Sequence, residues 1–139
     1  YSRPTKDKTA EFFEVCKSLA DYVFLDCTSS LDDPLSVYGM AAADKAVQLV
    51  TPDIRSAAYY ASFEKTYEQV KGKSIGVINI TDKDLYLPVG GVKAGFSNAK
   101  YILPYSMYLK QQYITGELTH KIPDQKFSAV CRGIAGAVL

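Results

Sequence analysis

The sequence predicts an α/β fold in which a mostly parallel sheet of about four strands is flanked by helices. Short apolar runs alternate with amphipathic stretches of helical length, and this alternation is typical of parallel sheets covered on both faces. The chain has 139 residues, of which 47% are hydrophobic and 22% are charged. These values indicate one α/β unit over residues 1–139 and exclude a disordered chain.

The first half of the chain is predicted to contain three helices and two strands. We expect helices over residues 5–20, 33–43 and 53–70, and strands over residues 22–25 and 46–50. Asp33 and Asp53 precede the second and third helices, where a carboxylate accepts from first-turn amides that have no helical partner. The run at 22–25 is apolar and rich in strand-forming residues.

The second half is predicted to add two strands and two helices. The strands are expected over residues 75–78 and 101–103, and the helices over 105–116 and 124–139. Residues 81–99 contain Pro88 and several glycines, so we expect an irregular loop or hairpin there. Within it, Lys93 is followed by Ala94 rather than Ser or Thr, which excludes a nucleotide-binding phosphate loop.

Polar residues or prolines follow each of the four predicted strands. These residues are Asp26, Thr51, Asn79 and Pro104. The carboxyl ends of parallel strands share one edge, and open α/β sheets bind ligands just beyond that edge. The pattern therefore predicts a ligand site there, although polar residues also end strands simply by forming turns.

Each of these residues has a chemistry that suits a nucleotide. Asp26 is suited to holding Mg²⁺ through a water or to orienting an attacking water, and the hydroxyl of Thr28 follows in the next loop. The Asn79 carboxamide is able to pair with a donor and an acceptor on a purine edge. Pro104 and Tyr105 are able to form a flat wall beside an aromatic ring. The alternatives are local capping by Asp26, turn formation by Asn79 and strand termination by Pro104.

Cysteine usage and charge give weaker indications. The three cysteines, Cys16, Cys27 and Cys131, are widely spaced without a metal-binding motif, so we expect reduced, buried thiols in a cytoplasmic protein. Residues 71–139 carry nine basic and four acidic side chains, whereas residues 1–70 carry seven basic and eleven acidic ones. This asymmetry favours an anionic partner on one side but is too small for a nucleic-acid surface.

Four segments, taken in order, resemble ParA/MinD-type P-loop ATPases of the SIMIBI class. Residues 21–29 (DYVFLDCTS) resemble the strand that delivers the Walker B aspartate, with the switch II loop after it. Residues 42–53 (AADKAVQLVTPD) are similar to the next helix and strand of that family. Residues 75–79 (IGVIN) resemble the strand whose asparagine contacts adenine, and residues 102–106 (ILPYS), with Gly116 and Glu117 after a helix, resemble its final strand and adenine-flanking loop.

The resemblance implies the C-terminal half of an ATP-hydrolysing domain with ATP and Mg²⁺ as ligands. It implies that Asp26 acts at Mg²⁺ and the attacking water, that Thr28 and Asn79 contact the nucleotide, and that Pro104 and Tyr105 flank the base. Such proteins form homodimers around ATP and position a cellular cargo, often through an adaptor protein, so contact with DNA or a membrane stays open. The glycine-rich phosphate loop is expected upstream of Tyr1, so this segment alone is expected to be inactive.

Two other functions compete with the ATPase. One is a noncatalytic positioning or adaptor module with a degenerate nucleotide site, which is favoured because residues 27–30 (CTSS) replace the usual proline or glycine after the aspartate. The other is a receiver-like signalling domain that uses Asp26 and Thr51. It ranks last because Pro104 stands where such a domain needs a lysine.

Overall fold

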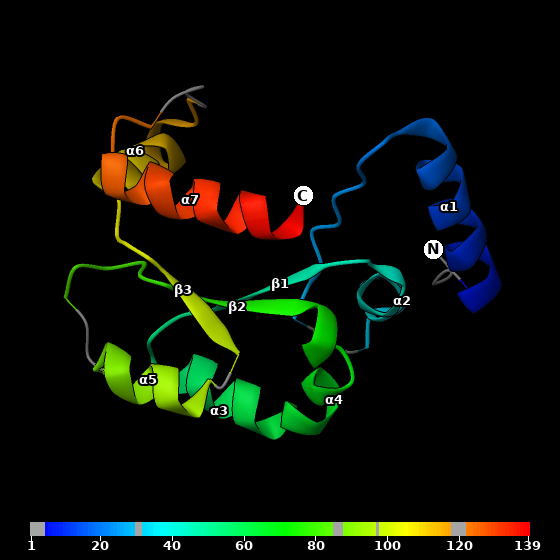
Figure 1. Ribbon diagram of the computed structural model, residues 1–139, viewed down its shortest axis with the longest axis horizontal. Helices are drawn as coiled ribbons and strands as arrows, with labels where there is room; N and C mark the ends of the chain where they lie inside the picture. Colours follow the sequence, from blue (N-terminus) through cyan, green and yellow to red (C-terminus); the bar gives the residue numbers. More distant parts are fainter. Residues whose placement is uncertain (1–4, 30–31, 85–87, 97, 118–121) are drawn as a thin grey trace. The chain divides into compact units, whose positions relative to one another are not determined.

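The computed structural model describes residues 5–29, 32–84, 88–96, 98–117 and 122–139 (Figure 1). The chain divides into two compact units, Tyr1–Asp44 and Lys45–Leu139, which are described separately below. Among the described helices, none is long and apolar enough to cross a membrane.

The first unit is a pair of helices, α1 (Lys6–Leu19) and α2 (Pro34–Ala42). Both begin where the sequence predicts, because the side chains of Thr5 and Asp33 accept hydrogen bonds from first-turn amides. Phe13 of α1 is buried and stacks on Tyr38 of α2, with ring centroids 5.6 Å apart. This aromatic contact joins the two helices.

The strand predicted at residues 22–25 does not form. This segment joins α1 to α2 as irregular chain, with Tyr22 61% and Phe24 78% exposed. A strand exists only where a neighbour pairs its backbone N–H and C=O groups, and no described strand pairs with this segment. An apolar run is therefore not sufficient to form a strand. The segment instead passes close to α2, since a Cβ placed on Gly39 would lie 3.0 Å from Leu25 Cδ1.

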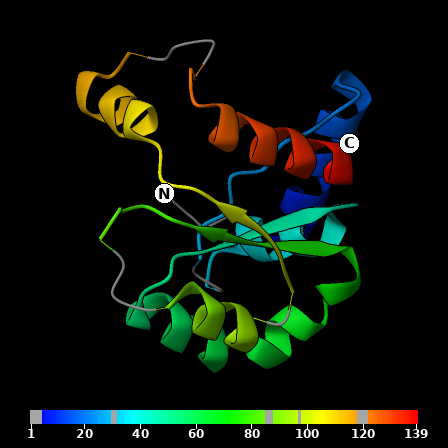
Figure 2. The same ribbon diagram turned by 60° about the vertical axis from the view of Figure 1, so that its left-hand side comes forward.

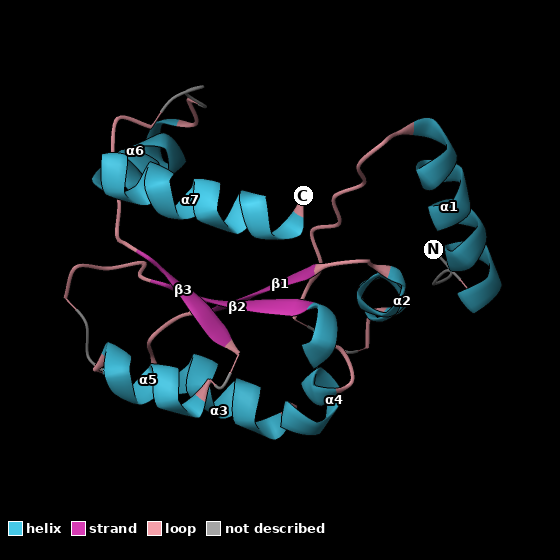
Figure 3. Cartoon of the chain, in the orientation of Figure 1, coloured by secondary structure: helices cyan, strands magenta, loops and turns pink. Residues whose placement is uncertain are grey.

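The second unit contains a three-stranded parallel sheet in the order β1 (Ala46–Val50), β2 (Ser74–Asn79) and β3 (Ala99–Leu103) (Figure 3). The predicted α/β class with parallel strands flanked by helices is confirmed. The described residues contain three strands instead of about four because residues 22–25 lack a partner.

Helices lie on both faces of this sheet. They are α3 (Ile54–Ser62), α4 (Glu64–Glu68), the 3₁₀ turn η1 (Lys71–Lys73), α5 (Val89–Gly95), α6 (Met107–Thr115) and α7 (Gln125–Val138). Figures 1 and 2 show α3 and α5 on one face and α7 on the other. The single helix expected over 53–70 is interrupted at Phe63, where α4 begins.

The core on the α3 and α5 side corrects the prediction for residues 81–99. Val50, Ile78, Val92 and Phe96 form one buried cluster, and Tyr60 packs against Phe96 edge to face. Residues 89–95 are helical although glycine disfavours helices, because a helix places Val92 and Phe96 on one buried face. The expected irregular loop therefore contains α5.

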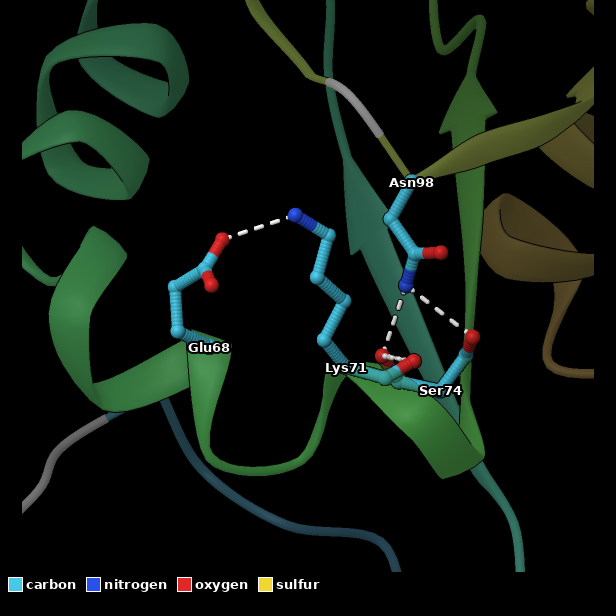
Figure 4. A network of polar contacts seen from close by, with 4 residues as sticks. All are labelled: Glu68, Lys71, Ser74 and Asn98. Carbon is cyan, nitrogen blue, oxygen red and sulfur yellow. Dashed lines mark hydrogen bonds and ion pairs between the residues drawn. The ribbon is translucent and has the colours of Figure 1, made fainter.

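Gly76 lets β2 approach the start of β3 closely. Its N–H donates to Asn98 O at 2.9 Å, and an added Cβ would lie 2.5 Å from that oxygen. Asn98 Nδ2 in turn donates to Ser74 O and Oγ at 3.0 and 2.6 Å (Figure 4). Beside it, Lys71 pairs with Glu68 at 2.8 Å. The bonds of Gly76 and Asn98 fix where the two strands begin to pair.

Replacing Gly76 with alanine is expected to destabilise the protein. The new methyl group meets backbone atoms, which yield less readily than a side chain, so the free energy of unfolding should fall by about 1–3 kcal/mol. Chemical denaturation measures this. Gly136→Ala is the matched control because, apart from its chain neighbours and its own helix backbone, no described residue has an atom within 4 Å of the added Cβ. It should leave stability unchanged or raise it by about 0.5–1 kcal/mol. Equal effects of the two substitutions would contradict the assigned close approach.

Candidate functional site

An open hollow of about 420 Å³ lies beyond the carboxyl ends of β2 and β3. Asn79 ends β2, Pro104 and Tyr105 follow β3, and the register pairs Asn79 with Leu103. The structure therefore brings together three of the residues that the sequence singled out. The volume lies within the range of about 300–1,000 Å³ that small-molecule sites occupy.

Apolar surfaces form most of the wall. Leu109 and Tyr113 come from α6, Phe127 comes from the first turn of α7, and Pro104 completes the wall from the strand end. Phe127 is buried, whereas Tyr113 is exposed. The aromatic rings of Tyr113 and Phe127 suit contact with a planar ring.

The Asn79 carboxamide has no hydrogen-bond partner within the described ranges. At the carboxyl ends of β2 and β3 the hydrogen bond comes instead from the backbone, where Ile80 N donates to Leu103 O at 2.9 Å. An unpaired carboxamide offers two donors and an acceptor, so it is able to read a ligand edge that carries both. If Asn79 only forms a turn, as the alternative in the sequence analysis has it, its side chain takes no part in that turn through hydrogen bonds with the described residues.

Ser106 also lines the hollow, and although it lies in the segment 102–106 that carries the resemblance, the sequence assigned it no role of its own. It is 5% exposed, and its Oγ bonds to none of the residues that the structure describes. Ser106 stands at the N-cap of α6 without capping it through its side chain. In sequence, a serine before a helix indicates only a cap, so the unpaired hydroxyl gave no signal.

The electrostatic character of the hollow is positive. Lys110 is the only charged side chain among its described lining residues, and the N-terminus of α6 lies beside it. A helix N-terminus carries a partial positive charge. The hollow therefore favours ligands that present acceptors or negative charge.

Asp26 and Thr28 lie in the first unit and end no strand, which corrects the expected position of Asp26. Asp26 is exposed in the irregular segment that precedes α2. Thr28 N donates to Ser36 Oγ at 3.0 Å, and Ser36 Oγ donates to Asp33 Oδ2 at 2.5 Å. Thr28 is thus tied to the capped start of α2. Ser30, part of the predicted switch loop, lies outside the described residues.

The cysteines are less buried than predicted. Cys27 is exposed, Cys16 and Cys131 are half-buried, and all three are free thiols. Partial burial raises the pKa of Cys27, against a hydrogen bond with Ser36 that lowers it. Cys27 is therefore protonated near neutral pH. Within the described ranges, no group of three or more His, Cys, Asp or Glu side chains is placed to hold a metal ion.

Thr51, which follows β1, serves the start of α3. Its Oγ1 donates to the Asp53 carboxylate, and its N–H donates to Ser56 Oγ at 3.1 Å. Ser56 N also donates to Asp53 at 2.9 Å. The bonds from Thr51 and Ser56 lower the pKa of the Asp53 carboxyl. The Thr51 hydroxyl is thus engaged in local capping.

No family model, curated protein or solved structure matches the chain. The hollow itself combines a flat apolar wall, an unpaired carboxamide, an unpaired hydroxyl and a positive end. This combination suits a planar heterocycle with hydrogen-bonding edges.

Replacing Asp53 is expected to reveal its role as a cap. Asp53→Ala should lower the free energy of unfolding by about 1 kcal/mol at pH 7, whereas Asp53→Asn should retain most of the stability. Because the pKa of Asp53 is lowered in the folded protein, its extra stabilisation exists above the ordinary value of 3.8 and is lost as the pH falls below it.

Denaturation between pH 7 and pH 2 tests this expectation. The gap between wild type and Asp53→Ala should shrink below pH 3.8, whereas the gap between Asp53→Asn and Asp53→Ala should stay constant. A wild-type gap that does not change with pH would contradict the capping role of the ionised carboxylate.

Proposed function

We propose that residues 45–139 form the base-binding part of a ParA/MinD-type P-loop ATPase domain, with ATP as the nucleotide. One observation carries this proposal: Asn79, Pro104 and Tyr105 line a single hollow at the carboxyl edge of parallel strands. These are the three residues to which the sequence resemblance assigns contact with adenine. The agreement supports the proposal because residues 79 and 104 are far apart in sequence.

Each residue of the hollow has a role in holding the base. The Asn79 carboxamide accepts from the adenine amino group and donates to a ring nitrogen, a paired contact that contributes about 1–3 kcal/mol. Pro104 and Tyr105 flank the ring, and stacking on an aromatic side chain contributes about 1–3 kcal/mol per base. The base alone therefore supports only weak binding.

Hydrolysis requires parts that this hollow does not supply. In the proposal, a longer protein provides the glycine-rich phosphate loop, whose amides hold most of the phosphate charge. Asp26 would hold Mg²⁺ through a water and would orient the attacking water, and Thr28 would contact the nucleotide. ATP binding then drives homodimer formation and positions a cargo in the cytoplasm. The exposed apolar side chains of Phe12 and Leu19 support contact with a partner protein, such as an adaptor.

A noncatalytic positioning or adaptor module is the second candidate. It is favoured by the position of Asp26, which lies in an exposed irregular segment rather than at a strand end. A catalytic carboxylate requires a fixed position, and none of the described strands pairs with this segment to fix it.

Adenosine is expected to bind the 139-residue chain weakly and to shift the NMR amide signals of residues 79–81 and 105–110. Asn79→Ala should weaken this binding about tenfold, because the carboxamide pair contributes more than 1 kcal/mol. Gln69→Ala is the matched control, since Gln69 is an exposed amide next to α4 and outside the hollow. Equal affinities of the two variants for adenosine would contradict the proposed contact of Asn79 with the base.

Asp26→Ala is expected to reduce ATP hydrolysis by the longer protein at least about 100-fold, because the attacking water loses its orienting group. The steady-state release of phosphate measures this. Asp84→Ala is the control, because Asp84 is an exposed aspartate outside the four segments that carry the resemblance and outside the hollow. Unchanged turnover in Asp26→Ala would contradict the catalytic role. A wild-type protein that binds its partner but releases no phosphate would favour the adaptor module.

A further inference from the structure

We propose that the N-terminus of α6, together with Ser106 and Lys110, binds a compact oxyanion of the phosphate class. This inference goes beyond base binding and does not depend on it, because different groups carry it. The base site is built on Asn79, Pro104 and Tyr105, whereas the anion site is built on the first turn of the helix.

The first turn of α6 supplies free backbone donors. The helix has nine residues, and Lys110 N donates to Ser106 O at 3.2 Å. The amides of residues 107–109 come before Lys110, so helical bonding provides no carbonyl oxygen for them. Such amides point out of the helix end, where they and the helix dipole favour an anion.

Ser106 is the independent indication of a ligand. Ser106 lines the hollow, and its buried hydroxyl bonds to none of the residues that the structure describes. Buried polar groups are nearly always paired, so an unpaired one beside a hollow points to a partner from outside the chain. Ser106 is the N-cap of α6, so its hydroxyl and the first-turn amides belong to the same end of the helix.

Lys110 supplies the charge. It lies four residues after Ser106, one helical turn along α6, and it lines the same hollow. No ion pair involves Lys110 within the described ranges, and none of the described lining residues is acidic. A tetrahedral oxyanion is able to accept from the amides, the hydroxyl and the ammonium group at the same time. The anion is either free phosphate or the phosphate group of a nucleotide.

Titration of the 139-residue chain with inorganic phosphate, at constant ionic strength set with chloride, tests the site. The NMR amide signals of residues 106–110 should shift with saturation in the millimolar range. Ser106→Ala and Lys110→Gln should each weaken binding about fivefold or more. Lys93→Gln is the matched control, because Lys93 is an exposed lysine of α5 outside the hollow. Equal losses in all variants would overturn the proposal.

Ser106→Ala also separates a binding role from a structural one. Without phosphate, this variant should melt at the same temperature or a few degrees higher, because it removes a buried hydroxyl that has no partner. A serine that served only as a helix cap would instead lower the melting temperature. A lower melting temperature together with unchanged phosphate affinity would overturn the assignment.

Three ligands distinguish the source of the anion and separate this proposal from base binding. NMR shifts on addition of inorganic phosphate without a nucleoside support binding of a free anion. Tighter binding of AMP than of adenosine supports binding of an anion that is carried by a nucleotide. If phosphate has no effect and AMP binds no better than adenosine, the anion site fails while base binding stands. If phosphate binds and adenosine does not, base binding fails while the anion site stands.

Discussion

The parallel pairing of β2 with β3 is the constraint on which the candidate site depends. Because Asn79 and Leu103 are register partners, the two strands end together, and Pro104 follows directly at the same edge. The two strands begin to pair at Gly76, where the absence of a side chain lets β2 accommodate the backbone of Asn98, and their register shifts between Gly76 and Val77. From Val77 onward the pairing continues without a shift to Asn79 and Leu103, and this stretch positions the residues that follow the strands.

The short connection after β3 gives the hollow its two chemical characters. Only three residues separate the end of β3 at Leu103 from the start of α6 at Met107. The same turn therefore presents a flat wall, through Pro104 and Tyr105, and the positive end of a helix. One ligand with a planar ring and an acidic group would use both features.

Much of the fold follows from local sequence signals, whereas part of the site does not. The aspartate caps and the strand over 46–50 are where the sequence predicts them, because capping bonds and apolar runs are local. The apolar run at 22–25 was wrongly predicted to be a strand, because strand formation depends on a neighbouring strand that pairs with it. Residues 89–95 were wrongly predicted to be irregular, because burial of Val92 overrides the low helix propensity of glycine. Ser106 was missed because an unpaired hydroxyl is a three-dimensional property.

The unpaired segment before α2 also affects how the protein will behave in solution. Its backbone amides at Tyr22 and Phe24 take part in none of the hydrogen bonds between described residues, and both aromatic side chains are exposed. Such amides exchange their hydrogens with water quickly, and exposed aromatic residues in extended chain are preferred cleavage sites of chymotrypsin. This segment therefore marks where limited proteolysis would first separate α1 from the rest of the chain.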